Sequence, residues 1–143
     1  MADATESSIV IDASAAAIMD VIADLPAYPE WSDGVKSIEV LAEYEDGRPA
    51  DARFTVDAAG IKDVYDLEYD WDGNNRVDWK LTKGGKLKRN DGSYILEEVD
   101  GRTKVSYKLV VDLSIPMVGM LKRKFEKGIV ETALNGLKKR VEG

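Results

Sequence analysis

The sequence predicts an α+β domain in which a long antiparallel sheet curls around one C-terminal helix. Tight hairpins need positive φ values, which glycine supplies at little cost. Five glycine turn signals occur in the middle of the chain, at Asp46-Gly47, Ala59-Gly60, Asp72-Gly73, Gly84-Gly85 and Asp100-Gly101. The segments between them are rich in β-branched and aromatic residues, which favours a meander of six antiparallel strands. An amphipathic pattern from about Pro116 to the end predicts the helix that covers the sheet.

Shorter elements are expected before the meander. Ser7–Ile11 is a candidate strand. Asp12 or Ser14 can cap a helix that follows, and this helix should end at Leu25-Pro26 because proline disfavours helical geometry in the residue before it. A second short turn or helix is expected at 28–31, with the sequence Tyr-Pro-Glu-Trp.

Length and composition indicate one ordinary globular unit. The chain has 143 residues, 44% hydrophobic and 33% charged, so we expect a single domain over residues 1–143. No apolar run approaches the roughly 20 residues of a membrane span, so we expect no integral membrane segment. The polar, acidic start from Met1 to Ser8 shows no secretory signal, and a cytoplasmic location is the expectation.

The residue types that are missing narrow the chemistry. The chain contains no histidine and no cysteine. This removes the commonest general base, the commonest metal ligand and the Ser-His and Cys-His nucleophile pairs. Carboxylates show no spacing that suggests a metal site, so we expect no metal, no cofactor and no assignable catalytic residue. Any catalysis would rest on carboxylates, lysine, arginine, tyrosine or water, and Glu98 is one weak candidate.

Charge is distributed unevenly along the chain. The net charge is −7, but residues 1–72 carry an excess of acids and residues 116–143 an excess of bases. An acidic protein is repelled by nucleic acid phosphates, so no nucleic acid partner is expected. The basic final helix could contact an acidic partner or anionic lipid, although neutralisation of the protein's own acidic half is the favoured interpretation.

Alternation along the strands sorts the two faces of the sheet. The clearest case is 63–72, where aromatic and aliphatic residues alternate with acids, so one face is buried and the other is wet. The segment Asn90-Asp91-Gly92 is interpreted as a bulge or bend within a strand. The residues expected to face inward are Phe54, Val56, Ala58, Tyr65, Leu67, Tyr69, Trp71, Val77, Trp79, Leu81, Tyr94, Leu96, Val105, Tyr107, Leu109, Val111 and Leu113.

The final helix is expected to bury an apolar sector that includes small residues. At about 100° per residue, Met117, Leu121, Phe125 and Ile129 share this sector with Gly128, Thr132 and Gly136. Lys124, Lys127, Glu131 and Lys138 fall on the opposite, solvent side. The small residues indicate either a close approach of the helix to the sheet or room for a ligand, and both remain open.

The order of elements and several segments resemble the START-like (SRPBCC) superfamily, in particular its polyketide cyclase/dehydrase and coenzyme Q-binding branch. The segments are 25–31 (Leu-Pro-Ala-Tyr-Pro-Glu-Trp), 90–94 (Asn-Asp-Gly-Ser-Tyr) and 111–113 (Val-Asp-Leu) running into Pro116. The resemblance implies a helix-grip fold, a seven-stranded antiparallel sheet wrapped around the long C-terminal helix, with two short helices after the first strand. It also implies a cavity, which in family members holds sterols, phospholipids, quinones or polyketides. No catalytic histidine or arginine motif of the family's enzymes can be assigned.

The cavity implied by the resemblance gives a set of candidate ligand-binding residues. Large aromatic side chains are commonly core filling, but several inward tyrosines favour a roomy, partly polar interior, because buried hydroxyls need hydrogen-bond partners. Tyr28 and Trp31 are expected to pack and close the structure rather than contact a ligand. The candidates are Phe54, Val56, Tyr65, Leu67, Tyr69, Trp71, Trp79, Tyr94, Leu96, Tyr107, Leu109, Met117, Leu121, Phe125, Gly128 and Thr132.

These features favour binding or transport of a small hydrophobic or amphipathic molecule, such as a lipid, quinone or polyketide. The alternatives are a polyketide cyclase/dehydrase-type enzyme and a protein-interaction module with a vestigial cavity. Loops that combine apolar residues with proline or glycine suit an entrance. The entrance is therefore expected between Leu25–Gly34, Ala58–Ile61 and Ser114–Gly119.

Overall fold

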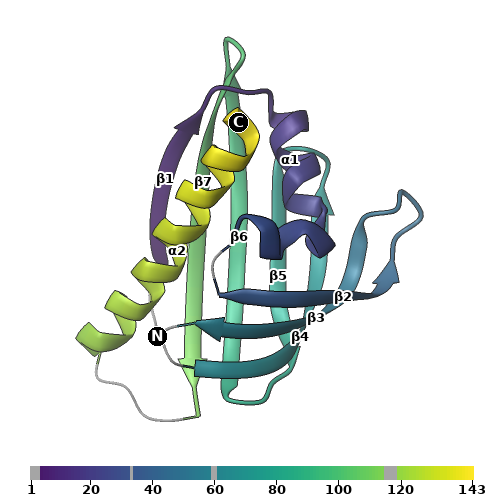
Figure 1. Cartoon of the computed structure of the whole chain (residues 1–143). Coiled ribbons are helices and arrows are strands. Elements are labelled where there is room, and N and C mark those ends of the chain that lie inside the picture. Colours follow the sequence, from purple (N-terminus) through teal and green to yellow (C-terminus); the bar gives the residue numbers. More distant parts are fainter. Residues whose placement is uncertain (1–3, 33, 59–60, 115–118) are drawn as a thin grey trace.

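The computed structural model describes residues 4–32, 34–58, 61–114 and 119–143. It contains a seven-stranded antiparallel sheet in the order β1-β7-β6-β5-β4-β3-β2 and a long helix, α2 (Gly119–Glu142), that crosses it (Figure 1). This confirms the expected helix-grip architecture. The strands are β1 (Thr5–Ile11), β2 (Val35–Glu43), β3 (Pro49–Ala58), β4 (Ile61–Asp72), β5 (Arg76–Lys83), β6 (Leu87–Val99) and β7 (Arg102–Leu113).

Two short helices follow β1 and cover one end of the sheet. Helix α1 (Ala15–Ala23) begins after Ser14, whose hydroxyl oxygen accepts a hydrogen bond from the Ala17 amide at 3.2 Å. It is followed by the 3₁₀ helix η1 (Leu25–Glu30), which carries proline in its first turn. Figure 1 shows both elements at the end of the sheet where α2 terminates.

The sheet follows the alternation in the sequence. In β4, Leu67 and Tyr69 are buried while Glu68 and Asp70 are exposed. The hairpin between β6 and β7 turns at Asp100 and Gly101, which both have positive φ, at 54° and 79°. Two successive positive φ values are the backbone geometry that a two-residue β-hairpin loop requires.

Strand β6 differs from expectation at Asn90-Asp91-Gly92. The expectation there was a bulge or bend. These residues pair in register with Val111, Val110 and Leu109, so a bulge in the β6–β7 ladder is excluded, and the register shift lies between Leu87 and Arg89 instead. Gly92 is explained by a neighbouring ring, because a β-carbon there would overlap the Trp79 indole. The glycine therefore allows a close approach of an aromatic side chain to the backbone.

Helix α2 packs on the sheet through a different face from the one the sequence suggested. Its buried residues are Glu126, Val130, Ala133, Leu134 and Leu137. This face lies roughly 140° around the helix from the centre of the expected apolar sector, at 100° per residue. Glu126 lies within this buried stripe. Because a charged residue is assigned to the solvent side when apolar residues are counted around the helix, the buried face is not recognised as apolar.

The Glu126 carboxylate is accommodated because the sheet supplies it with donors. Its Oε1 accepts a hydrogen bond from the Thr5 hydroxyl at 2.8 Å, and its Oε2 accepts one from the Val111 amide at 2.7 Å. A buried polar group costs little when it is hydrogen-bonded. Glu126 thus joins α2 to the two strands on which the helix rests, β1 and β7.

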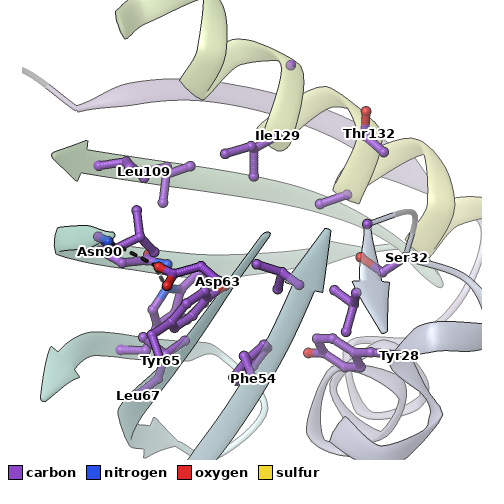
Figure 2. Close-up of a pocket in the computed structure, with 18 of the residues that line it drawn as sticks. Tyr28, Ser32, Phe54, Asp63, Tyr65, Leu67, Asn90, Leu109, Ile129 and Thr132 are labelled. Atoms are coloured by element: carbon purple, nitrogen blue, oxygen red, sulfur yellow. Dashed lines mark hydrogen bonds between the residues drawn. The ribbon is translucent and has the colours of Figure 1, made fainter. Parts of the chain in front are cut away.

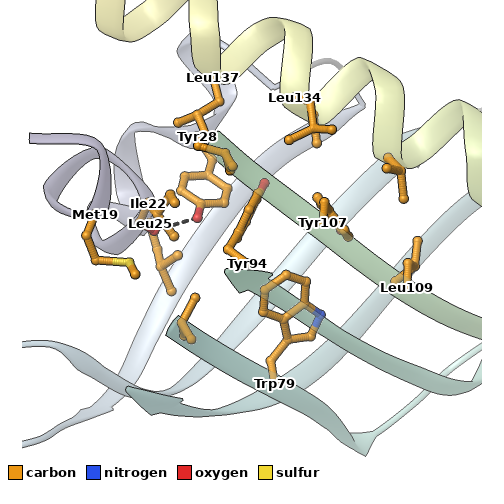
Figure 3. Packing of buried hydrophobic residues seen from close by; sticks show 14 of the residues in the cluster. Met19, Ile22, Leu25, Tyr28, Trp79, Tyr94, Tyr107, Leu109, Leu134 and Leu137 are labelled. Atoms are coloured by element: carbon orange, nitrogen blue, oxygen red, sulfur yellow. Dashed lines mark hydrogen bonds between the residues drawn. The ribbon is translucent and has the colours of Figure 1, made fainter. Parts of the chain in front are cut away.

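One part of the core lies where α1, η1 and the C-terminal half of α2 meet the sheet. Figure 3 shows Ile22 and Leu25 of the short helices and Leu134 and Leu137 of α2 in the same buried cluster, with Tyr28 between them. Ile18, Met19, Ile22, Leu25 and Leu137 are fully buried.

Among the described residues, no helix is long and apolar enough to cross a membrane.

Candidate functional site

A cavity of about 610 Å³ lies between the inner face of the sheet and one edge of α2. This volume is within the range typical of sites for small organic ligands. Figure 2 shows Ile129 and Thr132 on α2, across the cavity from Phe54 and Tyr65 of the sheet. Alternation along each strand points the inward side chains to the same face of the sheet. Because the sheet curls, strands that are not neighbours in it surround the same cavity.

Most of the candidate residues surround this cavity. The sequence-predicted residues that line it are Phe54, Val56, Tyr65, Leu67, Tyr69, Trp79, Tyr94, Tyr107, Leu109, Phe125, Gly128 and Thr132. Trp71, Leu96 and Leu121 do not line it, and Met117 lies outside the described residues.

The three exceptions have separate physical reasons. Trp71 is on the expected face, but it lies near the end of β4, where its Nε1 donates to the Pro49 carbonyl oxygen at 2.7 Å. Leu96 is buried in the packed core rather than at the cavity. Leu121 is 55% exposed, because the packing face of α2 is rotated away from it.

Aromatic rings form a continuous inner wall. The Trp79 ring lies 5.4 Å from the Tyr94 ring, 5.5 Å from the Tyr107 ring and 6.0 Å from the Tyr69 ring, measured between centroids. Trp79 Nε1 donates to Asn90 Oδ1 at 3.2 Å, so this buried donor is satisfied. The wall is held in one arrangement by edge-to-face and tilted ring contacts.

The tyrosines of this wall are neutral. Burial raises the pKa of Tyr69 and Tyr107, and neighbouring tyrosine hydroxyls raise it further. Burial is also the first cause of the raised pKa of Tyr65 and Tyr94. In the described part of the chain, no protein group is hydrogen-bonded to the hydroxyls of these four residues. Their O–H groups are therefore available as donors toward the cavity.

Tyr28 and Trp31 both line the cavity, in addition to the packing role expected from the sequence. Their ring centroids are 4.7 Å apart, and the Tyr28 hydroxyl donates to the Ile22 carbonyl oxygen. The residue that could have indicated that Trp31 lies against α2 is Gly136. A β-carbon there would lie 2.5 Å from the Trp31 carbonyl oxygen.

The small residues of α2 therefore have two different explanations. Gly136 allows a close approach of the chain at Trp31, whereas a β-carbon at Gly128 would meet nothing within 4 Å. Gly128 and Thr132 are exposed and line the cavity at the edge of the helix. The close approach at Gly136 is to the segment that follows η1 rather than to the sheet, whereas Gly128 borders open space.

Among the described residues, the charged groups on the cavity wall are Asp57, Asp63 and Lys124, and none of them is buried. The Asp63 carboxylate accepts hydrogen bonds from the Lys86 and Leu87 amides, at 2.9 to 3.1 Å, and so fixes the loop between β5 and β6. Glu98, the weak catalytic candidate, is exposed and accepts from the Ala15 amide at 2.6 Å, away from the cavity. No group of potential metal ligands occurs among the residues that the structure describes.

The expected entrance can be placed only in part. Trp31, Ser32 and Gly34, in the first of the three expected segments, line the cavity. Residues 59–60 and 115–118, at the centres of the other two segments, lie outside the described residues.

The fold and the cavity define a START-like domain, and the comparisons with known proteins agree. Residues 11–138 match the family described as polyketide cyclase / dehydrase and lipid transport, and the chain belongs to this family. The resemblance stated from the sequence is thereby confirmed. None of the curated proteins matches the sequence.

Solved structures repeat this architecture over nearly the whole chain. A START superfamily protein from Mycobacterium smegmatis is 25% identical with a TM-score of 0.92, and the match covers 99% of this chain and 98% of that one. The protein TTHA0849 from Thermus thermophilus is 27% identical with a TM-score of 0.80, covering 96% of both chains. The Zhui aromatase/cyclase from Streptomyces sp. R1128 is 18% identical with a TM-score of 0.77, covering 97% and 93%, a likeness that shows the fold alone.

Proposed function

We propose that the protein binds a small hydrophobic or amphipathic molecule, such as a lipid, quinone or polyketide, in the cavity between the sheet and α2, and carries it. The cavity itself is the observation that supports this proposal most strongly. About 610 Å³ is left open beside a core whose side chains at the other end are fully buried. Burying apolar surface is the main source of affinity for such a ligand.

The chemistry of the wall supports the same class of ligand. Leu67, Leu109 and Ile129 supply aliphatic surface, and the aromatic rings supply flat surface. The polar groups among them are mostly neutral hydroxyls. A ligand with an apolar body and a few oxygen atoms would match both parts of this wall.

Binding fits the structure better than catalysis, the rival activity that the family description includes. General acid–base catalysis is most effective when the catalytic pKa lies near the working pH. The raised pKa values of the cavity tyrosines take them further from neutrality. Asp63 is already committed to two backbone amides. Turnover of a polyketide substrate would instead support the enzyme.

The proposal is tested by filling the cavity from its helical edge. Gly128→Leu and Thr132→Leu place a larger side chain where α2 borders the cavity. We expect both variants to keep their stability and to bind the uncharged dye Nile red about tenfold more weakly in fluorescence titrations, which corresponds to about 1.4 kcal/mol.

Lys127→Leu is the matched control, because Lys127 is exposed on the same helix and does not line the cavity. It should bind the probe as the wild type does. Equal affinity in all four proteins would contradict binding in the cavity. Absence of probe binding to the wild type would favour an interaction module with a vestigial cavity.

A further inference from the structure

The described part of the cavity wall contains several hydrogen-bond donors that have no partner in the protein. The hydroxyls of Tyr65, Tyr69, Tyr94 and Tyr107 have no hydrogen-bonded protein partner in the described part of the chain. Trp31, which also lines the cavity, has its Nε1 buried without an acceptor in the same part of the chain. Buried polar groups are normally paired, and leaving a donor unpaired in a dry environment is costly.

Two of the side-chain acceptors on the same wall are already occupied. Asn90 Oδ1 accepts from Trp79, and the Asp63 carboxylate accepts from two backbone amides. The one lining cation, Lys124, is exposed on α2, so the described wall places no buried positive charge opposite a ligand. A ligand carboxylate would have to keep its charge in this cavity with hydroxyl donors alone, at a higher cost than a neutral carbonyl oxygen.

The donors surround flat aromatic surface. The Tyr94 and Tyr107 rings are 4.7 Å apart, and Trp79 is within 6.0 Å of both of them and of Tyr69. On β3 and β4 of the same sheet, Phe54 and Tyr65 stack at 5.5 Å with their planes only 6° apart. Parallel and edge-on rings of this kind match a planar ring system better than a flexible acyl chain.

On the basis of the proposed binding function, we infer that the ligand is an uncharged, ring-containing molecule that directs carbonyl oxygens toward the tyrosine hydroxyls. An acyl chain would leave these donors unpaired, and a carboxylate would have no cation inside the cavity. A ketone or quinone oxygen accepts hydrogen bonds without carrying charge. The inference therefore separates quinone- or polyketide-like ligands from simple fatty acids.

A matched pair of probes tests this inference by equilibrium dialysis. 2,3-Dimethyl-1,4-naphthoquinone and 2,3-dimethylnaphthalene share a ring skeleton and differ in two carbonyl oxygens. The hydrocarbon is the more hydrophobic of the two, so a purely apolar cavity would prefer it. We expect the quinone to bind at least about tenfold more tightly, and palmitic acid to bind more weakly than the quinone.

Removal of the hydroxyls should abolish this preference. We expect the triple variant Tyr69→Phe, Tyr94→Phe, Tyr107→Phe to lose the preference for the quinone. Its affinity for 2,3-dimethylnaphthalene should stay the same. If the triple variant does not fold, Tyr107→Phe alone should reduce the ratio of the two affinities. Tyr44→Phe is the control, because the Tyr44 hydroxyl donates to the Tyr69 carbonyl oxygen and does not line the cavity.

The outcomes distinguish this inference from the function on which it rests. Equal or tighter binding of the hydrocarbon or of palmitic acid would overturn the carbonyl preference and leave hydrophobic ligand binding in place. An unchanged ratio in the phenylalanine variants would also overturn it. If the wild type bound none of the three probes, the proposed binding function would fail as well.

Discussion

The two ends of the space between the sheet and α2 are built differently. At one end, Ile22 of α1, Leu25 of η1 and Leu137 of α2 are fully buried in the core. At the other end, Gly128 borders open space, and Leu109 and Ile129 line a cavity of about 610 Å³. One helix forms both ends, so its packed C-terminal half can fix the geometry of the fold while the edge of its N-terminal half leaves room. This difference teaches that stability and binding can be altered separately.

The largest expected effect is at the packed end. Leu137→Ala should lower the free energy of unfolding by about 2–5 kcal/mol, because it leaves a void among residues that cannot collapse into it. Leu121→Ala, on the exposed side of the same helix, should change it by less than about 0.5 kcal/mol. Urea denaturation followed by circular dichroism measures both. Similar losses in the two variants would mean that α2 packs through another face.

The next effect concerns the hydrogen bonds that join α2 to the strands beneath it. Glu126→Ala removes the acceptor of the Val111 amide and should cost about 1–3 kcal/mol. Glu126→Gln keeps a side-chain oxygen for that amide and should cost less. The same denaturation experiment checks the order of the three proteins. A glutamine variant as unstable as the alanine variant would show that the negative charge, rather than the accepted hydrogen bond, stabilises the contact.

Substitution by alanine at two glycines of α2 should change the stability of the protein in opposite directions. Gly136→Ala places a β-carbon 2.5 Å from the Trp31 carbonyl oxygen and should destabilise by about 1–3 kcal/mol. Gly128→Ala meets open space and should stabilise by up to about 1 kcal/mol through helix propensity. Thermal unfolding of the two variants gives the signs directly. A loss of stability in both would indicate that the helix edge at Gly128 is packed rather than open.

The smallest effect is a pH dependence from the tyrosines at the open end. Burial raises the pKa of Tyr94 in the folded state above its unfolded value near 10, so the folded protein holds this proton more firmly. The stability from this group is complete below pH 10 and is lost as the pH rises further. Above pH 10, the wild type should lose up to about 1.4 kcal/mol more per pH unit than Tyr94→Phe does. Parallel stability curves for the two proteins between pH 9 and pH 11 would be evidence against this.

The sheet could be predicted from the sequence because its determinants are local. The turn at Asp100 and Gly101 needs two positive φ values, and the alternation in β4 needs only the period of a strand. These two rules also placed most of the cavity wall, including Tyr65, Tyr69 and Tyr107. Position along a strand was harder, since Trp71 has the expected direction and lies beyond the cavity.

The packing face of α2 and the reason for Gly92 could not be predicted, because both depend on contacts between distant segments. The buried Glu126 is acceptable only because Thr5 and Val111 donate to it, and neither is near it in sequence. Gly92 resembles a bulge signal, whereas the structure shows the Trp79 indole against its backbone. A helical count or a turn rule contains no information about such partners.

The most direct test of the account is to locate a bound probe by nuclear magnetic resonance. Methyl groups of Leu109 and Ile129 report on the cavity, and those of Ile22 and Leu137 report on the packed end. On titration with 2,3-dimethyl-1,4-naphthoquinone, we expect the first pair to shift saturably with one binding constant and the second pair to stay nearly unchanged. Shifts confined to exposed Leu121 or Val64, or equal shifts at both ends, would contradict ligand binding at the open end of this space.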